Sequence, residues 1–176
     1  MLKPIMDARD ASAMYSIKDS AKLAAYCRSV ATRFATVDGF CGAGKSTLAT
    51  DLAEQLNWPL ISFDDFLPDD SMNVQSYVAR LDWDRLARTI RGQANAVLEG
   101  AFMREVVQGT VVRAEMTTVY VALCSHPMPE RVIWHDGMRI EDGDGPAADW
   151  LTELETDYHR RWRPHEDADA ICLRRE

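Results

Sequence analysis

Eight residues in the first third of the chain have the types and the spacing of a phosphate-binding loop. They match the pattern G-x-x-x-x-G-K-[ST] in full: Gly39-Phe40-Cys41-Gly42-Ala43-Gly44-Lys45-Ser46. Glycine adopts the backbone angles that point successive N–H groups at one anion, and the N-terminal end of a following helix adds positive potential. The motif therefore predicts that the chain binds the phosphates of a nucleoside triphosphate.

Residue types within this loop predict individual roles. Lys45 is expected to place its charge on the β- and γ-phosphates, and the Ser46 hydroxyl is expected to ligate Mg²⁺. Lys45 is also the only lysine beyond residue 22. ATP and Mg²⁺ are thus the expected cofactors. The residues expected to contact the nucleotide are Gly39, Cys41, Gly42, Ala43, Gly44, Lys45, Ser46 and Thr47.

Two adjacent aspartates, Asp64 and Asp65, follow a strand expected at 59–63. In a parallel sheet, the carboxyl end of a neighbouring strand opens onto the crevice that holds the phosphates. A carboxylate there can accept the proton of an attacking hydroxyl or hold Mg²⁺ through water. We expect Asp64 to be the catalytic base. Asp65 is the alternative, and capping of a following helical turn is the ordinary role open to both.

Short apolar segments alternate with helical patterns, which predicts an α/β fold with parallel strands covered by helices on both faces. The expected strands are 34–37, 59–63, 96–98, 117–123 and 170–173. The expected helices are 17–32, a helix starting near Ser46, 77–90, 129–140 and one around 151–162. Residues 1–16 lack periodicity and are expected to form an irregular arm. We expect one domain over residues 1–176, with its core at 34–173.

Composition narrows the choice of partner. The chain has 28 acidic against 20 basic residues and a net charge of −8 at pH 7. This balance argues against a protein that coats nucleic acid or an anionic membrane. The four cysteines stand far apart without metal-site spacing, and no apolar run approaches the ~20 residues of a membrane span. We therefore expect a cytoplasmic protein with a small-molecule partner, and its oligomeric state stays open.

Three segments resemble those of a known kinase family: GFCGAGKSTLA at 39–49, ISFDDF at 61–66 and VLEG at 97–100. They are similar to the P-loop kinases grouped around uridine kinase, phosphoribulokinase, pantothenate kinase and nicotinamide riboside kinase. The resemblance implies a three-layer P-loop NTPase sandwich with a five-stranded parallel sheet of order 2-3-1-4-5 and a short lid at 136–148. It also implies that Asp64 is the base and places Glu99 near the metal or the substrate. The expected metal ligands are Ser46, Asp64 and Glu99.

The family often carries a dense arginine cluster in the helix and lid after the fourth strand, and the corresponding stretch 130–139 offers only Arg131 and Arg139. These two are expected to neutralise charge on the transferring phosphoryl group, with a role as solvated surface arginines as the alternative. The acidic ribose-binding residue of the nucleoside kinases is absent near Gln75-Ser76. A ribonucleoside substrate is therefore not secured.

The sequence thus predicts an ATP-dependent, Mg-assisted transfer of the γ-phosphoryl group to a hydroxyl of a small nucleoside-like or vitamin-like metabolite. Two other functions stay open. One is a nucleotide-binding regulatory protein with little transfer activity. The other is a nucleoside monophosphate kinase, which is disfavoured because its acceptor brings a phosphate that needs several more arginines near the crevice.

Overall fold

A parallel sheet is the centre of the computed structural model, which describes residues 13–16, 18–68, 77–108, 110–111, 115–124, 149–164 and 166–175. Its strand order within these residues is β1-β6-β5-β2-β4-β3, and every neighbouring pair is parallel. The strands are β1 (Ala13–Ser16), β2 (Phe34–Gly39), β3 (Leu60–Ser62), β4 (Ala96–Glu99), β5 (Met116–Cys124) and β6 (Ala170–Arg175).

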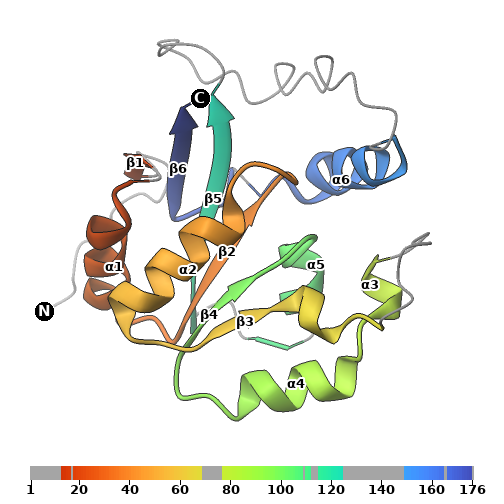
Figure 1. Cartoon of the computed structure of the whole chain (residues 1–176), viewed down its shortest axis with the longest axis horizontal. Helices are drawn as coiled ribbons and strands as arrows, with labels where there is room; N and C mark the ends of the chain where they lie inside the picture. Colours follow the sequence, from red (N-terminus) through yellow and green to blue (C-terminus); the bar gives the residue numbers. More distant parts are fainter. Residues whose placement is uncertain are drawn as a thin grey trace, which may run out of the picture.

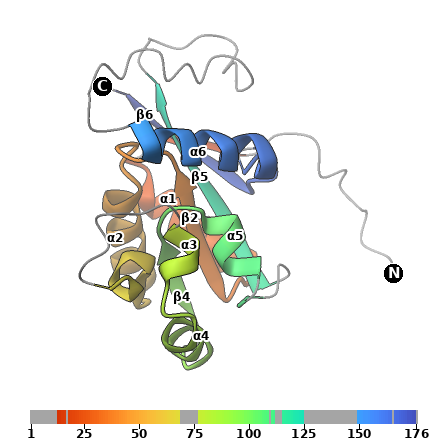
Figure 2. The ribbon, with the colours of Figure 1, turned by 90° about the vertical axis from the view of Figure 1, so that its right-hand side faces the viewer.

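Helices cover both faces of this sheet (Figure 1). Helices α1 and α2 lie on one face, and α5 and α6 lie on the other. Figure 2 shows α6 running across the strands near one end of the sheet. The helices are α1 (Ser20–Ser29), α2 (Lys45–Leu56), α3 (Tyr77–Arg80), α4 (Trp83–Arg91), α5 (Met103–Gln108) and α6 (Asp149–Trp162), with a 3₁₀ turn η1 at Phe63–Phe66.

Two apolar layers sandwich the central strands because successive side chains of a strand point to opposite faces. In β2, Ala35 and Val37 pack against α1 and α2, whereas Phe34 belongs to the cluster on the other face. The predicted helix after the phosphate loop is confirmed as α2. It buries an apolar stripe at helical spacing, formed by Leu48, Ala49, Leu52, Ala53 and Leu56.

The expected five-stranded sheet is wrong in its number of strands and therefore in its complete order, because the sheet has a sixth strand in the described part of the chain. This strand, β1, lies within the expected irregular arm and pairs in parallel with β6, from Ala13 opposite Ala170 to Ser16 opposite Leu173. Its pairing satisfies the backbone groups of β6 that would otherwise form an open sheet edge. Without β1, the strands follow one another as β6-β5-β2-β4-β3.

Two helical predictions also need correction. The helix expected at 17–32 is shorter, and the one expected at 77–90 is divided into α3 and α4. Asp82 marks the division: its side chain accepts a hydrogen bond from the Arg85 amide, and its own amide donates to the carbonyl of Phe66. An aspartate in this position caps a new helix. Helix α5 was not expected from the sequence. The helix expected at 129–140 and the lid expected at 136–148 lie outside the described residues.

The carboxyl ends of β2, β3 and β4 lie at the same end of the sheet because these strands are parallel neighbours. The phosphate loop follows β2, η1 follows β3, and Gly100 follows β4. These three connections bring together the residues from which the sequence predicts a site. Within the described residues, no helix combines the length and the apolar character that a membrane crossing requires.

Candidate phosphate-binding and phosphoryl-transfer site

The phosphate loop connects the end of β2 to the start of α2, as its motif predicts. Two of its glycines are required by the backbone. Gly39 has a φ of +143°, and a Cβ atom there would lie 2.4 Å from the carbonyl oxygen of Val121. Gly44 has a φ of +97° and precedes the first residue of α2. A side chain at either position would oppose the loop conformation, since positive φ favours glycine.

The start of α2 provides the anion-binding groups. The N–H groups of Lys45, Ser46 and Thr47 in its first turn have no partner within the helix, because the carbonyl four residues earlier lies before the helix begins. The Lys45 side chain is buried against the loop, and its Nζ donates a 2.9 Å hydrogen bond to the carbonyl of Phe40. Amides, helix dipole and ammonium group therefore converge where the motif places phosphates.

Ser46, Glu99 and Ser62 form a hydrogen-bonded group contributed by α2, β4 and β3. The Ser46 hydroxyl donates to Glu99 Oε2 at 3.2 Å, and the Ser62 hydroxyl donates to Glu99 Oε1 at 2.6 Å. Mg²⁺ prefers oxygen ligands and is commonly held by one or two protein carboxylates together with substrate phosphates and water. The oxygen donors of Ser46 and Glu99, next to the phosphate loop, fit such an ion. Groups of three or more metal-binding His, Cys, Asp or Glu side chains do not occur in the described residues.

Asp64 and Asp65 both lie in η1 and are exposed, but their contacts differ. The Asp64 carboxylate accepts a 2.6 Å hydrogen bond from the hydroxyl of Tyr77. Asp65 is tied through its backbone carbonyl, which accepts from Arg85 Nη1 at 3.2 Å. Burial is the main cause that raises the pKa of Tyr77, followed by the hydrogen bond and charge of Asp64 and the charge of Glu99. The phenol is therefore a firm donor to Asp64.

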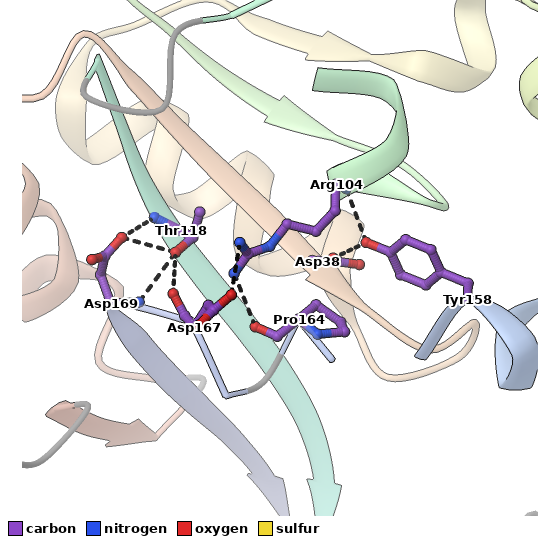
Figure 3. Close-up of polar contacts among 7 residues, drawn as sticks. All are labelled: Asp38, Arg104, Thr118, Tyr158, Pro164, Asp167 and Asp169. Carbon is purple, nitrogen blue, oxygen red and sulfur yellow. Dashed lines mark hydrogen bonds and ion pairs between the residues drawn. The ribbon is translucent and has the colours of Figure 1, made fainter. Parts of the chain in front are cut away.

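Asp38, the residue before the loop, is part of a buried polar network that the sequence analysis missed (Figure 3). Its Oδ2 accepts a 2.5 Å hydrogen bond from the Tyr158 hydroxyl, and its Oδ1 accepts from the Gly39 amide at 2.7 Å. Burial raises the pKa of Asp38 to about 6, although these two hydrogen bonds and the charges of Lys45 and Arg104 oppose the shift. The sequence signal that could have found Asp38 is an aspartate in a mostly apolar strand, directly before the first glycine of the loop.

Helix α6 also contacts the loop, and this too was missed. The Cys41 amide donates to the carboxylate of Glu155, at 2.9 Å to Oε1 and 3.3 Å to Oε2. The Phe40 and His159 rings stack at 3.8 Å with 11° between their planes. Desolvation and then the charge of Glu155 raise the pKa of the Cys41 thiol to about 11. Cys41 is consequently a protonated thiol at neutral pH rather than a reactive thiolate.

The structure brings most of the predicted site residues to one place. The residues predicted to bind nucleotide run from the end of β2 through the loop into the first turn of α2, and Glu99 is hydrogen-bonded to Ser46 among them. Asp64 is near enough to the loop for its charge to raise the pKa of Cys41. The predicted catalytic arginines Arg131 and Arg139 lie outside the described residues.

No protein-family model matches the chain, and no curated protein matches its sequence. A solved structure of a possible uridine kinase from Bacillus stearothermophilus is 15% identical, with a TM-score of 0.53 over 89% of this chain and 98% of that one. A shikimate kinase from Aquifex aeolicus is 18% identical, with a TM-score of 0.48 over 80% of this chain and 85% of that one. The first likeness shows that the two chains share the same α/β fold.

Proposed function

We propose that the protein is an ATP-dependent phosphotransferase that moves the γ-phosphoryl group to a hydroxyl of a small metabolite, nucleoside-like or vitamin-like. The observation that carries this proposal is the position of Asp64. Asp64 follows β3 at the same end of the sheet at which the loop follows β2. The charge of its carboxylate raises the pKa of Cys41 inside that loop. A phosphate cradle beside an exposed carboxylate is the arrangement that phosphoryl transfer to an alcohol requires.

Binding and charge stabilisation are assigned to the loop. The first-turn amides of α2 and the Lys45 ammonium would hold the β- and γ-phosphates. Ser46 and Glu99 would hold Mg²⁺, which would neutralise negative charge on the phosphates. We assign Arg131 and Arg139 to the same task from the lid side. Most of the catalytic effect would come from positioning and electrostatic stabilisation.

Asp64 is assigned the proton. As the acceptor oxygen forms its bond to the γ-phosphorus, the bond from that phosphorus to the β–γ bridging oxygen breaks, and ADP is the leaving group. The hydroxyl proton passes to the Asp64 carboxylate. Tyr77 occupies Oδ1 of this carboxylate, which leaves Oδ2 for the acceptor. The net charge of −8 supports a small acceptor rather than nucleic acid as partner, in keeping with a cytoplasmic enzyme.

The test combines nucleotide binding with an acceptor screen. ATP binding to the wild-type chain and to Lys45→Ala is measured by calorimetry, and nucleosides, vitamins and sugars are then screened for acceptor-dependent ADP release. We expect ATP binding that Lys45→Ala weakens strongly, and at least one acceptor that raises ADP release. ATP binding without any active acceptor would contradict transfer and favour a nucleotide-binding regulatory protein.

A further inference from the structure

Helix α6 approaches the phosphate loop from outside with side chains from a single helical turn. Glu155, Tyr158 and His159 lie at i, i+3 and i+4, a spacing that places them on one face of the helix. All three are buried. Together they contact three of the four consecutive residues 38–41, which span the end of β2 and the first half of the loop. Of the three, Glu155 is bonded to the backbone of the loop, whereas Tyr158 and His159 contact the side chains of Asp38 and Phe40.

Glu155 has a specific place in this interface. Only 5% of its surface is exposed, and within the described residues its carboxylate forms no ion pair and is hydrogen-bonded to Cys41, whose amide donates to it. Burial of a charged carboxylate without a countercharge costs free energy. A hydrogen bond from an amide to a charged oxygen offsets part of that cost and fixes the direction of the amide.

Some amides of the loop donate hydrogen bonds within the protein, and others have no partner in the helix that follows. Cys41 directs its N–H toward α6, and Ala43 directs its N–H to the carbonyl of Phe40 at 3.1 Å. The amides of Lys45, Ser46 and Thr47 belong to the first turn of α2, have no acceptor within the helix and are left for an anion. Glu155 therefore holds the loop by the amide of Cys41, itself a predicted nucleotide contact, and not by an amide from the first turn of α2. This division favours a supporting role over competition with the phosphates.

Tyr158 fixes the start of the loop through the same helix face. Its hydroxyl donates to Asp38, which in turn accepts the Gly39 amide, and it accepts a 2.9 Å hydrogen bond from the Arg104 amide (Figure 3). Arg104 also donates to the carbonyl of Pro164, just beyond the end of α6, at 3.3 Å. The Tyr158 hydroxyl is thus held by one hydrogen bond that it donates and one that it accepts, and these bonds fix α6 against the start of the loop.

We propose that Glu155 is a positioning residue of the nucleotide site: it holds the Cys41 amide so that the loop already has its phosphate-binding shape before nucleotide arrives. This inference rests on the proposed nucleotide binding and is independent of phosphoryl transfer. Preorganisation lowers the ordering cost of binding, so the effect of Glu155 is expected in ATP affinity.

The experiment compares substitutions at Glu155 with one at Asp157, an exposed acid on the same helix. ATP dissociation constants and melting temperatures are measured for wild type, Glu155→Ala, Glu155→Gln and the control Asp157→Ala. We expect Glu155→Ala to weaken ATP binding roughly tenfold, the size of one lost hydrogen bond to a charged group. Glu155→Gln should stay within about twofold, because its amide oxygen can still accept from Cys41. Asp157→Ala should match wild type.

Two results would overturn the proposal. Unchanged ATP affinity in Glu155→Ala with a lowered melting temperature would make Glu155 a structural residue alone. Tighter ATP binding in both Glu155→Ala and Glu155→Gln would make it an internal anion that competes with the phosphates. Should Glu155→Ala not fold, Glu155→Asp, whose carboxylate is one methylene shorter, must still bind ATP more weakly than Glu155→Gln. ATP binding without any active acceptor would contradict only the proposed transfer.

Discussion

The hydroxyl of Tyr77 donates a 2.6 Å hydrogen bond to Oδ1 of Asp64. The two residues come from different environments: Tyr77 starts α3 with a buried ring that contacts Phe102 at 5.5 Å, whereas Asp64 is exposed in η1. A buried ring cannot follow the motions of an exposed carboxylate. Tyr77 therefore restrains the orientation of Asp64 and leaves its second oxygen available.

Tyr77→Phe removes this restraint while keeping the ring. We expect kcat for acceptor-dependent ADP release to fall roughly tenfold, which corresponds to the loss of one hydrogen bond to a charged group. The dissociation constant for ATP should not change, because the Tyr77 hydroxyl donates to Asp64 in η1 and not to a residue of the loop. Steady-state kinetics and calorimetry separate the two quantities. Tyr26→Phe, on the α1 side of the sheet, is the matched control, and an unchanged kcat in Tyr77→Phe would refute the restraint.

Glu99→Gln tests the metal assignment. The carboxylate holds the hydroxyls of Ser46 and Ser62, and its charge is what a Mg²⁺ ion between loop and β4 requires. We expect the Mg²⁺ concentration for half-maximal activity to rise several-fold, since the neutral amide keeps an oxygen donor but loses the charge. Titration of activity with MgCl₂ at fixed ATP measures this. Glu105→Gln, whose partner Arg161 lies on α6, should leave the Mg²⁺ requirement as in wild type.

Asp38→Asn tests the buried carboxylate under the loop. Burial raises the pKa of Asp38 to about 6, whereas an unfolded aspartate titrates near 3.9. Between these values the folded chain binds the proton more tightly than the unfolded chain, so the contribution of Asp38 to the free energy of unfolding falls as pH rises from about 4 to 6. The loss is on the order of 3 kcal/mol and is complete above the folded pKa.

Asparagine cannot ionise, so Asp38→Asn should lack this pH dependence. Urea unfolding of both chains between pH 4 and pH 7 gives the comparison, and wild type should lose stability relative to Asp38→Asn as the pH rises. Parallel stability curves for the two chains would show that Asp38 titrates at its ordinary pKa. Asp51→Asn, an exposed position on α2, controls for the general effect of removing one acidic charge.

Local sequence patterns were sufficient for the part of the site that is local in the chain. The loop backbone needs positive φ at Gly39 and Gly44, which glycine adopts readily. The spacing of these glycines therefore predicts both the turn and the position of α2. Glu99 was placed through the resemblance to the kinase family, and the structure gives the physical reason: β4 is the parallel neighbour of β2 and ends beside the loop. These predictions depend on neighbours in sequence or on adjacent parallel strands.

Long-range pairs were not predictable. Tyr158 and Asp38 lie 120 residues apart, and Glu155 and Cys41 lie 114 apart, so no periodicity connects them. Strand β1 could not be predicted for the same reason. Its four residues lack an extended pattern of their own and become a strand by pairing with β6. Such elements depend on tertiary contacts, which outweigh local propensity.

The assignment of Asp64 as the base is tested most directly by acceptor-dependent ADP release from Asp64→Asn and Asp65→Asn under the same conditions. Removal of a general base costs roughly 10²–10⁴-fold in rate, so we expect Asp64→Asn to lose at least about a hundredfold in kcat. Its ATP affinity should remain that of wild type, and Asp65→Asn should keep normal turnover. Full transfer activity in Asp64→Asn, or a loss confined to Asp65→Asn, would contradict the assignment of Asp64 as the base.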